Sequence, residues 1–186
     1  KPVFVEAPIE QDFKITPEQL EAAITPKTKA LILCSPSNPT GSVYSAAELE
    51  ALATVLRRHP QVWVISDEIY EHINYVGAHA SIAACPEMYD RTIVINGVSK
   101  AYAMTGWRIG FLAAPLALSK ACSKLQGQYT SGPCSVSQVA ATEAFAGPQD
   151  CVETMRQAFA RRKDLIVKLA KEVPGFEVND PHGAFY

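Results

Sequence analysis

The chain has 186 residues, of which 48% are hydrophobic and 19% are charged, and its formal net charge at pH 7 is −2. This balance predicts a packed core and is unlike that of disordered chains. Interspersed charges with a slight acidic excess argue against a nucleic-acid or anionic-membrane surface, which needs a basic patch. No apolar run approaches the length of about 20 residues that a membrane-spanning helix needs.

Strands and helices alternate along the chain. Thr16, followed by Pro17, predicts the start of one helix, and Ser45 with Glu48 three residues later predicts a capping box at the start of the next. Predicted strands cover residues 1–6, 29–36, 62–69, 91–97 and 110–115, and predicted helices cover residues 17–24, 46–58, 115–128, 135–146 and 149–172. Strands separated by helices indicate an α/β fold, with a mainly parallel sheet and helices on both faces.

The cysteines give no sign of a disulfide framework. They are five in number, scattered and without CxxC spacing, namely Cys34, Cys85, Cys122, Cys134 and Cys151. They predict reduced thiols of a cytoplasmic protein, and the histidines lack ligand spacing, so no metal site is predicted. The first residues are strand-like and lack an initiator methionine, and the last, "PHGAFY", are also strand-like. We therefore expect a fragment of a longer protein.

Three predicted strands end in polar segments, "SPSNPTG", "SDEIY" and "NGVSK". Such ends lie side by side in a parallel sheet, so Asn38, Asp67, Tyr70 and Lys100 are expected to meet in one crevice. The carboxylate of Asp67 directly follows the apolar "VWVIS". Because a partly buried carboxylate needs a cation or several donors, Lys100, Arg108 or a ligand must compensate its charge.

One ligand, pyridoxal phosphate, satisfies this set of groups. It needs an amine to form a Schiff base, a carboxylate at its ring nitrogen, donors for its phenolic oxygen and a cationic site for its phosphate. Lys100 would be the amine and general base, and Asp67 the carboxylate. Asn38 and Tyr70 would be the donors, and Arg108 the phosphate clamp.

The segments "SNPTG", "SDEIY" and "SKAYAMTGWRIG" resemble, in order and spacing, those of fold-type I, class I and II aminotransferases, especially bacterial-type aspartate aminotransferases. The resemblance covers essentially the whole chain. It implies the same cofactor roles for Asn38, Asp67, Tyr70, Lys100 and Arg108, with Lys100, Asp67 and Tyr70 as catalytic groups. It also implies a cis bond before Pro39. Many relatives have a phosphate-binding serine where this chain has Gly97, and Ser99 is the nearest substitute.

The resemblance implies an enzyme that moves an amino group between an amino acid, with aspartate expected, and a 2-oxo acid, with 2-oxoglutarate expected. Residues 1–150 would form most of a cofactor-binding large domain with a seven-stranded type of sheet. Residues 151–186 would form a linking helix and the truncated start of a small domain. A cytoplasmic homodimer is implied for the full-length protein. Another pyridoxal phosphate reaction of this fold, such as C–S β-elimination, a regulatory relative and an inactive fragment remain alternatives.

Each of these residues also has a purely structural interpretation. Asp67 could cap a helix, Asn38 could shape a turn, Tyr70 could pack in the core and Arg108 could form a surface ion pair. Phe185 could approach a substrate, although core packing is the simpler interpretation. The combination of segments, rather than any single residue, favours the functional interpretation.

Overall fold

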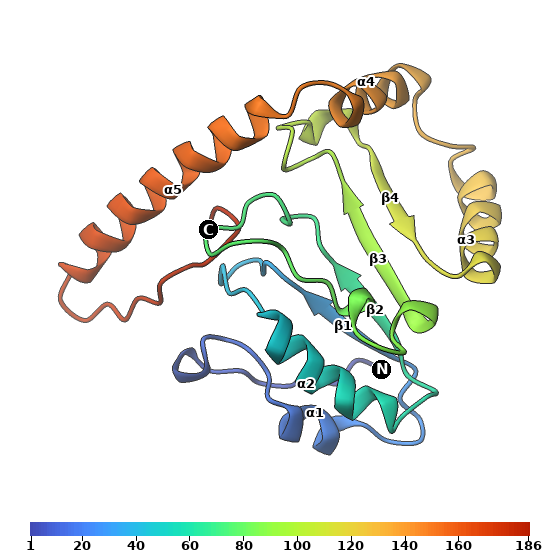
Figure 1. Cartoon of the computed structure of the whole chain (residues 1–186), viewed down its shortest axis with the longest axis horizontal. Helices are drawn as coiled ribbons and strands as arrows, with labels where there is room; N and C mark the ends of the chain where they lie inside the picture. Colours follow the sequence, from blue (N-terminus) through green and yellow to red (C-terminus); the bar gives the residue numbers. More distant parts are fainter.

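The computed structural model describes residues 1–186 and contains one four-stranded sheet (Figure 1). Its strands are β1 (Ala30–Cys34), β2 (Trp63–Asp67), β3 (Thr92–Gly97) and β4 (Gly110–Ala113), in the order β1-β2-β3-β4. The first three strands are parallel, and β4 is antiparallel to β3. The predicted α/β fold with a mainly parallel sheet is confirmed, and this chain supplies four strands of it.

The α-helices begin and end within one residue of the predicted bounds. They are α1 (Pro17–Ala23), α2 (Ala46–Arg57), α3 (Leu116–Tyr129), α4 (Ser135–Ala146) and α5 (Asp150–Lys171), with short 3-10 helices at Ile9–Gln11, Ile82–Ala84, Tyr89–Arg91 and Thr105–Trp107. Both predicted caps form, because the side chains of Thr16 and Ser45 complete capping boxes with Gln19 and Glu48. None of the helices combines the length and apolarity that crossing a bilayer requires.

The main hydrophobic core lies between α2 and one face of β1 and β2. Leu49 and Leu56 of α2 pack there with Leu33 and Val64 of the strands. Side chains alternate between the two faces of a strand, and Ile32, on the opposite face of β1, is 74% exposed. Helices are expected to pack on both faces of the sheet. In this chain a helix packs on one face of β1, and the other face of β1 is exposed to solvent.

The strand predicted at residues 1–6 does not form, so this prediction was wrong. No strand pairs with the segment, and Val3 and Phe4 are 75% and 87% exposed. Residues with a high strand propensity form a strand only beside a neighbour that completes their backbone hydrogen bonds. This segment has no such neighbour in the chain.

The last residues return from the far end of α5 to the centre of the molecule (Figure 1). The N–H of Gly183 donates to the carbonyl of Gly41 at 2.8 Å, and the N–H of Ala184 donates to the carbonyl of Ile73 at 2.8 Å. Gly183 also forms an isolated β-bridge, so "PHGAFY" contributes one bridge rather than a strand. The segment thereby ties together the loops that follow β1 and β2.

Gly97, at the end of β3, lies too close to the neighbouring backbone for a side chain. A Cβ at this position would lie 2.8 Å from the carbonyl oxygen of Ile109 and 2.9 Å from the Cα of Gly110. Both are backbone atoms and cannot rotate away. Gly97, at the position where the resemblance implies a serine, therefore coincides with a close approach of β3 and β4.

We expect Gly97→Ala to lower the free energy of unfolding by about 1–3 kcal/mol, because the added methyl group must separate the two strands. Chemical denaturation of the full-length protein measures this loss. Gly127→Ala in α3 is the matched control, because a Cβ there would meet nothing within 4 Å, and alanine is the better helix former. Equal destabilisation by the two substitutions would contradict the prediction.

Candidate functional site

The predicted site residues lie at the carboxyl ends of the parallel strands. The strand registers place Cys34, Asp67 and Ile95 side by side. Asn38 comes four residues after the end of β1, and Lys100 comes three residues after the end of β3. This is the edge at which open α/β sheets bind ligands.

Asp67 and Arg108 line a cavity of about 260 Å³ at this edge, and Ser99 lines it with them. The remaining lining residues are Ile69, Ile95, Asn96, Ile109 and Gly110. Oδ1 of Asp67 accepts a hydrogen bond from the N–H of Ile69 at 3.2 Å. None of the ion pairs of this chain includes Asp67. The cavity therefore contains a carboxylate that can meet a cationic group of a ligand.

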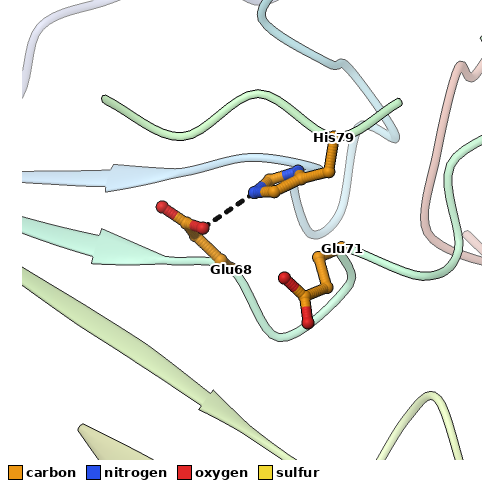
Figure 2. Close-up of side chains that lie close together, drawn as sticks. All are labelled: Glu68, Glu71 and His79. Carbon is orange, nitrogen blue, oxygen red and sulfur yellow. Dashed lines mark hydrogen bonds and ion pairs between the residues drawn. The ribbon is translucent and has the colours of Figure 1, made fainter. Parts of the chain in front are cut away.

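Glu68, the first residue after β2, belongs to a separate buried network (Figure 2). Its Oε1 accepts hydrogen bonds from the hydroxyls of Ser66 at 2.8 Å and Ser81 at 2.6 Å, and its Oε2 lies 2.8 Å from Nε2 of His79. Glu71 lies beside this pair. One of its carboxylate oxygens is within 4.8 Å of a carboxylate oxygen of Glu68 and of a ring nitrogen of His79. Because both oxygens of Glu68 have protein partners, the cluster is explained as a network that fixes the loop after β2.

Asn38 and Tyr70 converge on one oxygen atom. Nδ2 of Asn38 donates to the phenolic oxygen of Tyr186 at 3.1 Å, and the hydroxyl of Tyr70 lies 2.9 Å from the same oxygen. The bond between Asn38 and Pro39 is cis, as the resemblance implies. The structure thus brings together the two groups predicted to meet a phenolic oxygen.

The hydroxyl of Tyr70 keeps its proton over the neutral pH range. Burial raises its pKa above the ordinary value, and the hydrogen bond with Tyr186 raises that pKa further. A protonated phenol can donate one hydrogen bond and accept others. Tyr70 is therefore available as a donor at the edge of the sheet.

The amine of Lys100 lies beside aromatic rings. Its Nζ is 5.6 Å from the ring centre of Tyr70 and 5.3 Å from that of Phe185, where an ammonium is attracted to the π-electrons. Ser99, its neighbour in sequence, lines the cavity of Asp67. Lys100, Asn38 and Tyr70 do not themselves line this cavity, so the predicted site residues follow one sheet edge without all lining a single crevice.

Arg108 has a backbone φ of 56° and follows the 3-10 helix Thr105–Trp107. Its Nη1 donates to the carbonyl of Thr105 at 2.9 Å, and no carboxylate pairs with it. The guanidinium can thus still bind an anion bidentately. The surface ion pair that was the structural alternative for Arg108 does not form.

The family model of class I and II aminotransferases matches residues 1–186, the whole of the chain. The chain belongs to this family. An "Aspartate/prephenate aminotransferase" of Cereibacter sphaeroides is 54% identical over 187 residues, a match that covers 100% of this chain and 47% of the relative. An "Aspartate aminotransferase" of Geobacillus stearothermophilus is 52% identical over 187 residues, with the same coverage of 100% and 47%.

The solved structures agree with this assignment. The crystal structure of the aspartate aminotransferase from Rhizobium meliloti matches with a TM-score of 0.96 and 47% identity, over 99% of this chain and 46% of that one. The chain therefore spans about half the length of the aminotransferases that it matches. The resemblance to bacterial-type aspartate aminotransferases is confirmed.

Tyr186 and Glu68 of this aminotransferase chain are not among the predicted site residues. Tyr186 meets Tyr70 across 116 positions of the sequence, and no local pattern signals such a contact. Glu68 carried a usable signal, because Ser66 and Glu68 are two residues apart and so share one side of an extended chain. Phe185, for which core packing was the simpler interpretation, lies beside the amine of Lys100.

Proposed function

We propose that this chain is part of a longer pyridoxal phosphate-dependent aminotransferase that transfers the amino group of aspartate to 2-oxoglutarate. Membership of the family supports the reaction class. The printed names of the relatives, aspartate aminotransferase and aspartate/prephenate aminotransferase, support the choice of aspartate. They also suggest prephenate as a second oxo acid to test.

The observation that carries the proposal is the convergence of Asn38 and Tyr70 on a phenolic oxygen. That oxygen belongs to Tyr186, and the two distances of 3.1 and 2.9 Å are those of ordinary hydrogen bonds. The two groups are therefore spaced so that both can reach one phenol oxygen, which is what the cofactor requires of them. The residues present fit the group.

The other residues complete the cofactor site. Asp67, which has no cationic partner in the chain, would hold a proton on the ring nitrogen of the cofactor, and Arg108 would bind its phosphate, with Ser99 as a further donor. Lys100 would supply the amine for the covalent link. When bound, pyridoxal phosphate withdraws electrons from the substrate Cα, so that its C–H bond becomes acidic.

The amine of Lys100 would then move the proton. As general base, the amine of Lys100, when not engaged in the covalent link, would accept the proton from the substrate Cα and hold it at Nζ for return. The rings of Tyr70 and Phe185 beside its Nζ would hold the amine close to this path. Tyr70, which keeps its proton, would remain a hydrogen-bond donor throughout.

The larger organisation follows from the same proposal. Residues 1–150 would form most of the cofactor-binding large domain, and residues 151–186 would form the linking helix and the start of a small domain. The full-length protein would be a homodimer in the cytoplasm. Its amino acid and 2-oxo acid substrates would be its small-molecule partners.

The test is an assay of the full-length protein with ¹⁵N-labelled aspartate and 2-oxoglutarate. We expect labelled glutamate and oxaloacetate in equal amounts, because an aminotransferase returns the amino group to a second oxo acid. Prephenate in place of 2-oxoglutarate tests the second acceptor. If no labelled glutamate forms from aspartate, while a cysteine-type substrate with sulfur on its Cβ releases a thiol, ammonia and pyruvate, the reaction is C–S β-elimination and the proposal is overturned.

A further inference from the structure

Tyr186 bridges the two groups that the proposed function assigns to the phenolic oxygen of the cofactor. Its Oη lies 3.1 Å from Nδ2 of Asn38 and 2.9 Å from Oη of Tyr70. Its ring meets the ring of Tyr70 edge to face, with the centres 6.0 Å apart. The hydroxyl and the ring of Tyr186 therefore both contact the site.

Backbone contacts hold Tyr186 in this position. Gly183 is hydrogen-bonded to Gly41, in the loop that carries Asn38, and Ala184 is hydrogen-bonded to Ile73, in the loop that carries Tyr70. A Cβ at Gly183 would lie 2.6 Å from the Cβ of Pro36, so the segment lies directly against the first of these loops. Tyr186 consequently joins two loops to which its own segment is already attached.

The hydrogens available fix the direction of the bond with Asn38 and leave two possible directions for the bond between the hydroxyls. The amide of Asn38 must donate to Tyr186, because Nδ2 accepts nothing, and it retains a second N–H. In the bond between Tyr186 and Tyr70 either hydroxyl can be the donor. If Tyr186 donates, the hydrogen of Tyr70 is free for another acceptor, and so is the second N–H of Asn38.

We propose that Tyr186 is a positioning residue that directs the O–H of Tyr70 and the second N–H of Asn38 toward the phenolic oxygen of the cofactor. This inference rests on the proposed function. Tyr186 accepts from the amide and donates to the phenol, so each of the two groups keeps one hydrogen for the cofactor. The bridge also fixes the distance between the two donors.

The test is Tyr186→Phe in the full-length protein, which removes one oxygen and keeps the ring. We expect the dissociation constant for pyridoxal phosphate, measured by titration of the apoprotein, to rise about 3- to 10-fold, the effect of losing one or two hydrogen bonds. The pH midpoint of the cofactor's near-visible absorption should also move upward. With weaker donors the phenolic oxygen holds more negative charge and binds the neighbouring proton, at the nitrogen of Lys100, more tightly.

Tyr89→Phe is the matched control. Tyr89 is 78% exposed. Its substitution by phenylalanine should leave both the dissociation constant and the pH midpoint unchanged. Thermal unfolding of the apoproteins shows whether Tyr186→Phe keeps the fold. If Tyr186→Phe does not fold, Tyr186→His, which retains a hydrogen-bonding side chain, takes its place in both measurements. Its dissociation constant and pH midpoint should lie between those of the wild type and those expected for Tyr186→Phe.

The outcomes separate the inference from the function on which it rests. If wild type and Tyr89→Phe bind the cofactor but Tyr186→Phe matches them in both measurements, positioning by Tyr186 is overturned and the proposed function stands. Tighter binding by Tyr186→Phe would also overturn it, because Tyr186 would then compete with the cofactor for Asn38 and Tyr70. If wild type does not bind the cofactor, the proposed function fails and the inference fails with it.

Discussion

Lys100→Ala is expected to abolish covalent attachment of pyridoxal phosphate to the full-length protein and to lower the rate of transamination by about 10⁴-fold or more. The amine of Lys100 has two proposed tasks, the covalent link and the proton transfer at the substrate Cα, and alanine removes both. Its position next to Tyr70 and Phe185 is not shared by a second lysine. No other lysine of this chain should therefore take over the covalent link and the proton transfer in Lys100→Ala.

Reduction with borohydride, followed by digestion and mass spectrometry, measures the attachment directly. In the wild type the reduced cofactor should be found on the peptide that contains Lys100. Lys27→Ala is the control, because Lys27 is an exposed lysine in a turn and should leave attachment and rate unchanged. Borohydride-fixed attachment at another lysine, or attachment to the protein that persists in Lys100→Ala, would contradict the role given to Lys100.

Asp67→Asn is expected to lower kcat by about 10²- to 10³-fold, the scale on which loss of a preorganised electrostatic partner acts. Asparagine has nearly the same shape, and its Oδ1 can still accept the hydrogen bond from Ile69 that Asp67 accepts at 3.2 Å. The substitution removes the charge that would keep the ring nitrogen of the cofactor protonated. The unfolding midpoint should stay close to that of the wild type.

Steady-state kinetics with aspartate and 2-oxoglutarate give kcat, and Asp67→Glu tests whether a carboxylate on a longer side chain restores part of the rate. Asp90→Asn, at an exposed position, is the matched control for loss of one negative charge. A kcat for Asp67→Asn within about twofold of the control would remove this carboxylate from the proposed mechanism. Such a result would leave the assignment of Lys100 intact.

Much of the fold could be predicted because its signals are local. The capping boxes at Thr16 and Ser45 depend on residues three positions apart, and both form. Apolar runs predict the four strands that form, and the polar segments that follow the three parallel ones lie at one sheet edge because parallel strands all end on the same side. This geometry brought Asn38 and Tyr70 within reach of one oxygen.

What could not be predicted depends on partners distant in sequence. Residues 1–6 have the composition of a strand, but whether a strand forms is decided by a neighbour that the segment itself does not specify. The contact of Asn38 with Tyr186 spans 148 positions and requires the chain to return from the end of α5. The side chain of Gly97 is excluded by the backbone of Ile109 and Gly110, a restriction that appears only when β3 and β4 are paired.

The end of β2 also limits how the chain can change in length. Ser66 and Glu68 share the buried network, while Asp67 between them lines the cavity, so three consecutive residues serve opposite sides of the sheet. A deletion or insertion of one residue within β2 would exchange these sides. The carboxylate of Asp67 would then point away from its cavity, and the carboxylate of Glu68 would leave its network. Viable length variants of this segment should therefore differ by pairs of residues, or place the extra residue in the loops on either side of the strand.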